Sequence, residues 1–486
     1  MEPIERVLDV EVVGDLAGYE AKGGGTALRV VGEGGTDAVM AVLSTSGLRG
    51  RGGAGFPTAT KWQAIIDNRP PGVALSVVVN AAEGEPGSFK DRAIIRANPY
   101  RVLEGAMIAA LTVGADEVVV ATKARFATEV ARLRAAAAEM ATAGWAPGIT
   151  VDVVEGPDEY LYGEETALLE VVDGRLPFPR IAPPWRRGID DDGSDTAASA
   201  GVDMASDATD TPPALVNNVE TMANVALIVA HGAEWFRQVG TADSPGTIVC
   251  TITGHTERAG VVEVAMGTPL GEVIAEVGGR GENGDLIAAL SGVSNPILPA
   301  SSFDTPLTYE DMKAAGSGLG TGGFIVFDES VDLVAVAQGV SRFLAVESCG
   351  QCTPCKQDGL AVSEALERLQ GSDGSETDVV EVQDRLRTID TGARCFLATQ
   401  HQLVVGSLLA LFPDIVAGHA AGGGEPGGPY LIAELEDLVA GDDGYEAVVD
   451  VRHADKQPDW SYDAEPSGQA PADRLDQADG EVELDQ

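Results

Sequence analysis

Four cysteines have the spacing of a metal or redox site. Cys349, Cys352 and Cys355 form a C-x2-C-x2-C motif, and Cys395 follows 40 residues after the third of them. Three close thiolates with one distant thiolate are typical of a [4Fe-4S] cluster, whereas a structural zinc site more often uses two pairs of ligands. The motif therefore predicts an iron–sulfur cluster, with zinc as the alternative. The fifth cysteine, Cys250, lies in a strand-like run, and we expect a plain core side chain there.

A glycine-rich stretch at residues 46–63 contains G-x-G-x-x-G, with Gly50, Gly52 and Gly55 at the spaced positions. In a dinucleotide-binding fingerprint this spacing follows a strand and precedes an acidic ribose ligand by about 20 residues. Here the preceding residues have the apolar spacing of a helix that ends at Gly47. The stretch therefore indicates either a different phosphate-binding loop or a simple turn.

An iron–sulfur cluster carries one electron at a time, so it needs a donor or an acceptor. Flavin is the most useful partner, because it accepts a hydride as an electron pair and releases single electrons. The glycine-rich stretch then becomes a candidate flavin site.

The composition is strongly acidic. Asp and Glu number 76 against 32 Lys and Arg, which gives a net charge of −44, and only 7 of the basic residues are lysines. Such a surface repels nucleic acid. It would also strain a compact fold unless concentrated salt screened the charge. The composition therefore predicts a halophilic protein, with a merely acidic protein as the alternative.

The chain shows no pattern that would take it into or across a membrane. Residues 1–18 are acidic and alternating, unlike a signal peptide, and the apolar run at residues 403–412 is too short for a bilayer-spanning helix. Five cysteines in 486 residues argue against a disulfide framework. We therefore expect a cytoplasmic protein without direct membrane insertion.

Three textures follow one another along the chain. Strand patterns at residues 75–80, 116–124 and 149–156 alternate with helical patterns, which predicts an α/β domain with a parallel sheet over residues 1–240. An acidic insertion at residues 189–213, with seven aspartates, is expected to be disordered. Short alternating segments predict a β-rich domain at residues 245–330. Roughly four helices predict a bundle at residues 331–416, and residues 417–486 form an acidic extension.

Six motifs in order make this chain similar to a known family. They are GRGGAGFPTATKW, VVVNAAEGEPGSFKDR, YLYGEETALLE, LVNNVETMANV, AAGSGLGTGGFIV and ESCGQCTPCKQ, the last together with Cys395. The chain resembles the NADH-binding flavoprotein subunit of respiratory complex I and its relatives in NAD-linked formate dehydrogenases and hydrogenases. The resemblance implies a Rossmann-like FMN and NADH domain, a ubiquitin-like β-grasp (SLBB) domain and a helical [4Fe-4S] domain, in that order.

The resemblance also implies residue roles. Glycine lets backbone amides approach a phosphate, and lysine supplies positive charge. Phe56, Glu85 and Glu165 are implied to bind NADH. The residues implied to bind FMN are Gly50, Gly52, Gly53, Lys61, Asn80, Tyr160, Gly163, Glu164, Asn217, Asn218 and Thr221.

Simpler roles are available for several of these residues. Asn217 and Asn218 precede a helix and could cap it. Glu164 and Glu165 could lie on a solvated face, and Lys61 could be a surface charge.

Two positions depart from the family pattern. Residues 80–83 read Asn-Ala-Ala-Glu where the family usually has Asn-Ala-Asp-Glu, so Glu83 is the carboxylate that remains beside the flavin. Residues 182–185 read Ala-Pro-Pro-Trp in place of Lys-Pro-Pro-Phe, so Trp185 keeps an aromatic surface in the nucleotide cleft without the cation.

Together these features predict an NADH dehydrogenase module. Hydride passes from NADH to FMN, and single electrons then pass to the cluster and on to partner subunits that carry iron–sulfur clusters. No side-chain acid or base is needed for the hydride step. The alternatives are an NAD-reducing diaphorase subunit of a soluble formate dehydrogenase or hydrogenase, and a non-catalytic scaffold stabilised by zinc.

Overall fold

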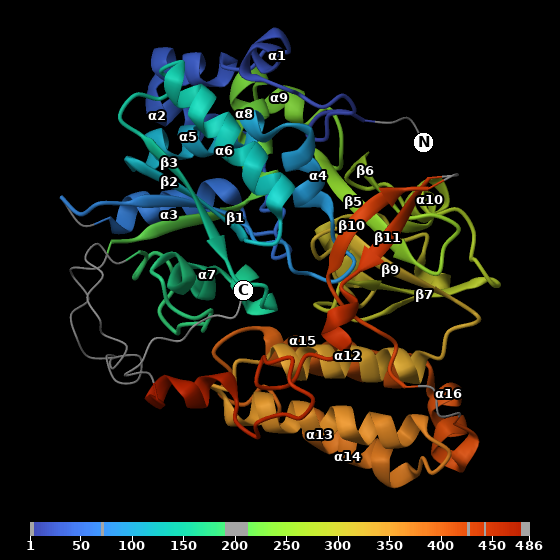
Figure 1. The fold of residues 1–486 in the computed structure, drawn as a ribbon. Coiled ribbons are helices and arrows are strands. Elements are labelled where there is room, and N and C mark those ends of the chain that lie inside the picture. Colours follow the sequence, from blue (N-terminus) through green and yellow to red (C-terminus); the bar gives the residue numbers. More distant parts are fainter. Residues whose placement is uncertain (1–3, 70–71, 190–211, 425–427, 442–443, 478–486) are drawn as a thin grey trace.

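The computed structural model describes residues 4–69, 72–189, 212–424, 428–441 and 444–477. Residues 190–211, which make up nearly all of the predicted acidic insertion, lie outside the described residues. Figure 1 shows three parts in chain order: an α/β part in blue to green, a β-rich part in yellow-green, and a helical part in orange. This order agrees with the predicted fold class.

The first part is built on a four-stranded parallel sheet in the order β3-β2-β1-β4. Val78 of β1 lies opposite Val119 of β2 and Val216 of β4, and all three are buried. A strand buried on both faces reads as a continuous apolar run, which is why β1 could be predicted. The strands are β1 (Ser76–Ala81), β2 (Glu117–Lys123), β3 (Thr150–Gly156) and β4 (Ala214–Asn218).

Helices pack around this sheet. Pro99 occupies the first turn of α5, and Asn98 caps it by accepting a hydrogen bond from the Arg101 amide. A Cβ at Gly105 would lie 1.9 Å from the Met222 carbonyl oxygen of α8, so this glycine permits close packing of the two helices. The helices are α1 (Leu16–Ala21), α2 (Thr26–Ser46), α3 (Thr58–Asn68), α4 (Lys90–Ala97), α5 (Pro99–Val113), α6 (Ala127–Thr142), η1 (Tyr160–Gly163), α7 (Glu165–Val172), α8 (Val219–His231) and α9 (Ala233–Phe236).

The second part is a five-stranded mixed sheet in the order β6-β5-β9-β7-β8. Its central pair, β5 and β9, is parallel, and the other pairs are antiparallel. One amphipathic helix, α10, buries Leu270, Val273 and Ile274 in the same core as Ile248 and Ile252 of β5. The elements are β5 (Thr247–Gly254), β6 (Gly260–Ala265), α10 (Leu270–Val277), β7 (Leu286–Ser291), β8 (Leu298–Pro299), η3 (Ala300–Ser302), α11 (Tyr309–Ala314) and β9 (Gly323–Asp328).

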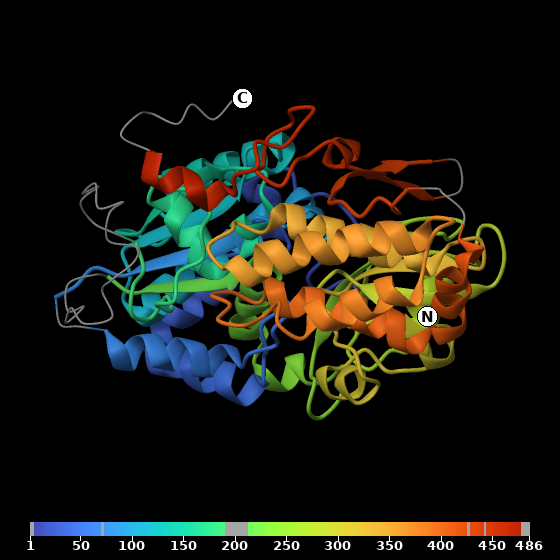
Figure 2. The same cartoon turned by 90° about the horizontal axis from the view of Figure 1, so that it is seen from below.

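Four longer helices form the third part, as predicted (Figure 2). They are α12 (Leu333–Glu347), α13 (Thr353–Gln370), α14 (Glu376–Leu386) and α15 (Leu397–Leu411), followed by α16 (Pro413–Gly418) and the π-helical turn η4 (His419–Gly423). Among the described residues no single helix is long and apolar enough to cross a membrane. One pair bent by 81°, Leu397–Leu411 with Pro413–Gly423, meets the length and composition limits together.

The chain then returns across the molecule. We call residues 428–474 the C-terminal extension; it contains the hairpin β10 (Leu435–Ala440) and β11 (Tyr445–Val449) and the short helix η5 (Val451–Ala454), and η6 (Pro471–Gln477) begins within it. Figures 1 and 2 show it in red-orange to red beside both the helical part and the α/β part. The sequence had indicated only an acidic extension here.

Candidate functional site

A cavity of about 630 Å³ opens where strands β1 and β4 end. Because the carboxyl ends of parallel strands are the usual ligand site in such sheets, its position is the expected one. All of the predicted NADH- and FMN-binding residues except Trp185 line this cavity. They are Gly50, Gly52, Gly53, Phe56, Lys61, Asn80, Glu83, Glu85, Tyr160, Gly163, Glu164, Glu165, Asn217, Asn218 and Thr221.

The glycine loop forms one wall, between α2 and α3. Its glycines have a steric reason to be there: Gly53 has φ of 115°, and a Cβ at Gly52 would lie 3.2 Å from the Asn218 Cβ. Arg51 anchors the loop. Its buried guanidinium donates to the carbonyls of Thr247 and Pro245, each at 3.1 Å. The loop therefore follows a helix, as the sequence indicated, and is fixed from the β-rich part.

The asparagines hold neighbouring segments together. Asn80 Nδ2 donates to the Gly163 carbonyl at 2.8 Å, and Asn217 Oδ1 accepts from Trp62 Nε1 at 2.8 Å. Asn218 caps α8 by accepting from the Glu220 amide at 3.0 Å. Capping, the simpler role considered for Asn218, is therefore correct, and the same residue also lines the cavity.

Two of the predicted carboxylates are engaged by local backbone. Glu83 accepts hydrogen bonds from the Ser88 hydroxyl at 2.6 Å and from the amides of Asp91 and Arg92, each at 3.2 Å. Glu164 caps α7 by accepting from the Ala167 amide at 2.8 Å, and burial raises its pKa. Both side chains border the cavity while shaping the loops that form it.

Glu85 connects all three parts of the molecule. Its Oε2 accepts from the Tyr160 hydroxyl at 2.7 Å, and its Oε1 accepts from the Val293 amide at 2.7 Å and the Ser294 hydroxyl at 2.6 Å. Gln400 of α15 donates to Tyr160 at 2.9 Å and to Ser294 at 2.8 Å. Burial raises the pKa of Glu85 and of Tyr160. The network ties the cavity wall to the helix that follows Cys395.

Lys61 and Glu165 form an ion pair at the cavity rim. Their Nζ and Oε2 atoms are 2.7 Å apart, and both side chains are partly exposed. Phe56 lies close by in the sequence and is 53% exposed. This rim therefore presents an aromatic ring and a paired charge to the cavity.

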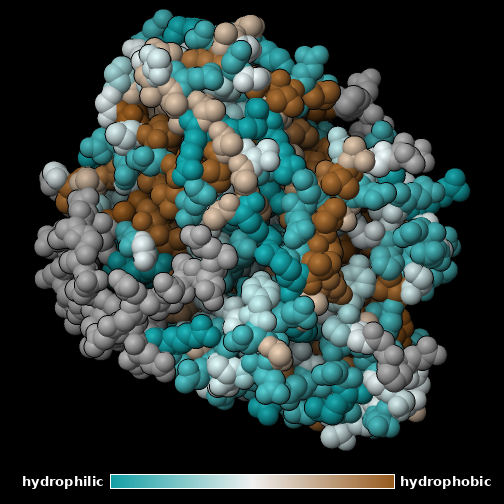
Figure 3. All heavy atoms as spheres, viewed as in Figure 1, coloured by the Kyte–Doolittle hydropathy of each residue, from teal (hydrophilic) through white to brown (hydrophobic). Residues whose placement is uncertain are grey.

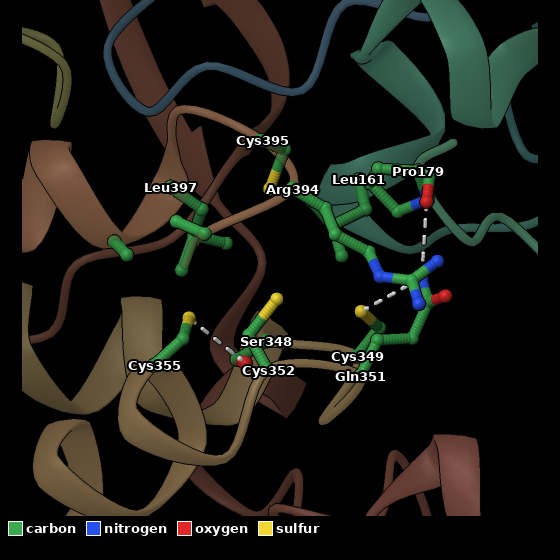
Figure 4. Close-up of a pocket in the computed structure, with 12 residues that line it drawn as sticks. Leu161, Pro179, Ser348, Cys349, Gln351, Cys352, Cys355, Arg394, Cys395 and Leu397 are labelled. Atoms are coloured by element: carbon green, nitrogen blue, oxygen red, sulfur yellow. Dashed lines mark hydrogen bonds between the residues drawn. The ribbon is translucent and has the colours of Figure 1, made fainter. Parts of the chain in front are cut away.

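The four cysteines of the motif line a second, much smaller pocket of about 10 Å³. Figure 4 shows their sulfur atoms facing a common space. Cys352 lies at the start of α13, and Cys395 lies two residues before α15. Burial raises the pKa of Cys349, of Cys395 and of Cys355, the last to about 11. Metal binding would release these protons.

The donor set suits an iron–sulfur cluster. Apart from the four thiols, the lining contains no carboxylate and no imidazole, and all-cysteine ligation is typical of [4Fe-4S] clusters. Within the described ranges, no three His, Cys, Asp or Glu side chains are arranged to hold a single metal ion. The two cavities meet, because Leu161, Cys395 and Leu397 line both.

Three family models match the chain in the order of its three parts. They are the Nuo51 FMN-binding domain at residues 43–227, the SLBB domain at residues 249–295, and the NADH-ubiquinone oxidoreductase-F iron-sulfur binding region at residues 335–419.

Curated relatives cover most of the chain. The NADH-quinone oxidoreductase F subunit 2 of Rhizobium meliloti (strain 1021) is 34% identical over 79% of this chain and 89% of its own length. The F subunit of the same enzyme from Mycobacterium tuberculosis (strain ATCC 25618 / H37Rv) is 35% identical over 81% of this chain and 87% of its own. The chain belongs to the NADH-quinone oxidoreductase F-subunit family.

A solved structure shares the fold of this F-subunit family member. An NAD+-reducing [NiFe]-hydrogenase in the H2-reduced state aligns with a TM-score of 0.73 at 30% identity, over 86% of this chain and 67% of that one. The predicted resemblance, the fold class and the cofactors FMN, [4Fe-4S] cluster and NADH are thereby confirmed.

Some residues of this family member differ from the sequence-based prediction. Trp185 is 41% exposed and is not among the residues that line the cavity. Cys250 is fully buried in β5, as expected of a core side chain. Asp91, Ser294 and Gln400 line the cavity without having been predicted. Asp91 lies within the quoted SFKDR motif, but no spacing in the sequence indicates the other two.

Proposed function

We propose that the larger cavity binds NADH and FMN and that Cys349, Cys352, Cys355 and Cys395 hold the [4Fe-4S] cluster. The observation that carries this proposal is the shared wall: Leu161, Cys395 and Leu397 border both the cavity and the cysteine pocket. When bound, FMN accepts a hydride from NADH, and the cluster takes single electrons. A shared wall keeps the distance between the two cofactors short.

The chain's own residues bind and orient in this proposal. The amides of the glycine loop and Lys61 supply the phosphate site, because amides and an ammonium attract an anion. Asn80, Asn217, Asn218 and Thr221 border the cavity at the strand ends and the first turn of α8. The ring of Phe56 and the carboxylates of Glu85 and Glu165 face the part of the cavity assigned to NADH.

Metal and flavin analysis of the purified chain tests the proposal. We expect one FMN and about four irons per chain, and bleaching of the flavin absorbance when NADH is added under anaerobic conditions. One zinc with no iron would favour the non-catalytic scaffold and overturn the electron-transfer assignment.

A second direction of electron flow has a specific observation in its favour, namely the likeness to an NAD+-reducing hydrogenase. In that case the same site would reduce NAD+ as a diaphorase subunit. Co-purification of neighbouring subunits from the native cell distinguishes the two. Partner subunits that carry iron–sulfur clusters are proposed in both cases, in the cytoplasm or at the cytoplasmic face of a membrane complex.

We also propose domain limits at residues 1–240, 245–330, 331–416 and 417–486. Contacts cross these limits: the amides of Arg6, Val7 and Leu8 all donate to Glu263 of β6, at 2.8 to 3.0 Å. The first residues of the chain therefore help to hold the α/β part against the β-rich part.

Adaptation to a salt-rich cytoplasm is a further part of the proposal. The net charge is −44, and the face in Figure 3 carries mostly hydrophilic residues with apolar patches between them. At 1 M salt, charges are screened beyond about 3 Å. We expect the melting temperature to rise from dilute buffer to molar KCl. A flat curve would leave a merely acidic protein.

A further inference from the structure

Glu347 is a buried carboxylate between the two cavities. It is the last residue of α12, two residues before Cys349, and its side chain is 3% exposed. Its Oε2 accepts a hydrogen bond from the backbone amide of Tyr160 at 2.9 Å. Tyr160 lines the larger cavity, and its hydroxyl donates to Glu85. Glu347 thus connects the cavity wall to the turn that carries Cys349.

Two basic side chains of the C-terminal extension face this carboxylate. Lys456 Nζ donates to Glu347 Oε1 at 2.8 Å, and His453 Nε2 lies 3.0 Å from the same oxygen. Lys456 is also buried, with 3% of its side chain exposed. Lys356 lies near the same turn, but its ammonium donates to the backbone carbonyls of Ala345 and Ser348 at 2.9 and 2.8 Å. Lys456 is therefore the lysine that balances the Glu347 charge.

The extension is seated on the turn by further contacts. Trp460 Nε1 donates to the Val346 carbonyl at 3.0 Å, and the Ala472 amide donates to the Cys349 carbonyl at 2.9 Å. A Cβ at Gly350 would lie 2.3 Å from the Cβ of Ala470, so the two backbones are in close contact. The matching family models end at residue 419, before the extension begins.

We propose that Lys456 is a positioning residue for electron transfer. It keeps Glu347 charge-balanced, so that Glu347 holds Tyr160 and the cavity wall against the turn of Cys349. Its positive charge also favours the reduced state of the cluster, since nearby charge sets cluster potentials. The inference rests on the proposed function, because it takes the four cysteines as cluster ligands.

Removing one partner of a buried ion pair leaves an uncompensated charge. Without Lys456, the Glu347 carboxylate would stand unbalanced two residues from a cluster ligand. Adding an electron to the cluster would then be less favourable, and the Tyr160 amide would lose a well-held acceptor. Both effects can be measured without turnover.

The test compares full-length, cluster-loaded variants. Lys456→Met should shift the cluster potential downward in an EPR-monitored titration, with roughly tenfold less reduced cluster at a fixed potential. Hydrogen exchange at the Tyr160 amide should quicken at least tenfold. Lys456→Arg should restore most of both values. The matched control is Arg474→Gln, which removes a cation of the same extension from a partly exposed pair with Asp459 at 3.4 Å and should change neither.

Unchanged potential and exchange in Lys456→Met would overturn the inference. If that variant does not fold, Glu347→Gln/Lys456→Met decides, because it removes both charges and keeps an acceptor for Tyr160. It should fold with a potential near that of wild type, and its failure to do so counts against the inference. A wild-type chain without iron overturns the proposed function instead. Tyr160 exchange in the iron-free chain then decides the positioning claim alone, supporting it if faster in Lys456→Met and overturning it if unchanged.

Discussion

The cofactor cavity and the cysteine pocket are held in shape by different interactions. In the cavity, polar side chains already bond to protein partners, as Glu85 does with Tyr160 and Ser294 at 2.7 and 2.6 Å. In the pocket, sulfur atoms make only long contacts, such as Cys355 Sγ with the Ser348 hydroxyl at 3.3 Å and Cys352 Sγ with the Gly392 carbonyl at 3.8 Å. The cavity wall is therefore built by the chain, whereas the cysteine arrangement depends on the group it binds.

This difference predicts different consequences for loss of each cofactor. Flavin release should leave the cavity wall intact, because its hydrogen bonds join protein groups. Cluster loss should loosen the turn at Cys349 and the start of α15, because the ligands come from two separate segments. The predictions below test the pocket first and the cavity rim last.

The largest effect is expected for Cys395→Ser. Cys395 is the ligand contributed from the distant segment, so its loss removes the covalent tie between the starts of α13 and α15. We expect the variant to lose most of about four irons per chain and to expose α15 to faster hydrogen exchange, while FMN stays bound. Iron analysis and exchange mass spectrometry measure both.

Cys250→Ala is the matched control for this substitution. Cys250 is buried in the β-rich part and is not among the residues that line the pocket. Its variant should keep its iron. Equal iron in the two variants would remove Cys395 from the ligand set, and loss of FMN together with iron in Cys395→Ser would contradict the independence of the two sites.

A middle-sized effect concerns His401, which lies in the helical part. Its Nε2 bonds the Ser341 hydroxyl at 2.7 Å, and burial lowers its pKa to about 3. The unfolded chain binds this proton near pH 6.5, so between about pH 6.5 and 3 the unfolded state binds more protons. The stabilisation is present above this window and is lost as the pH falls, by up to roughly 1.4 kcal/mol per pH unit.

Denaturant unfolding of the helical part at pH 6.5 and pH 5 measures this slope. Between these values we expect wild type to lose roughly 2 kcal/mol more stability than His401→Leu, which cannot take up the proton. His231→Leu is the control, because His231 is exposed. Equal slopes in wild type and His401→Leu would show that His401 is not a source of acid sensitivity.

Local features of the sequence were enough to predict much of the fold. The Val77–Val79 run of β1, the helix that ends at Gly47 and the cysteine motif each follow from neighbouring residues. Strand β4 was not predicted, because its five residues are short and follow the acidic insertion.

The sequence could not predict contacts between distant segments. Ser294 reaches Glu85 across 209 positions, and Lys456 reaches Glu347 across 109, so no periodicity relates the partners. Trp185 was assigned to the cleft by resemblance alone, and the structure leaves it outside the cavity lining. Side-chain chemistry thus indicated which groups could react, but only the packing of the three parts shows which of them meet.

The smallest effect is expected at the cavity rim, for Glu165→Gln. If Glu165 faces the adenosine ribose of NADH, its carboxylate repels the extra phosphate of NADPH, by at most roughly 4 kcal/mol at 4 Å. Lys61 lies 2.7 Å from this carboxylate and both side chains are partly exposed, so the pair and the solvent reduce the repulsion. The variant removes the charge and frees Lys61. We therefore expect the NADPH to NADH ratio of kcat/KM to rise about tenfold in dilute buffer, and less in molar KCl, since salt screens the remaining charge. Glu155→Gln is the matched control, because Glu155 also forms a partly exposed pair, with Arg134 at 2.7 Å, away from the cavity lining. Flavin content should stay constant in both variants. A ratio that rises equally in both would trace the effect to overall charge, and a ratio unchanged in Glu165→Gln would mean that another residue discriminates between the nucleotides.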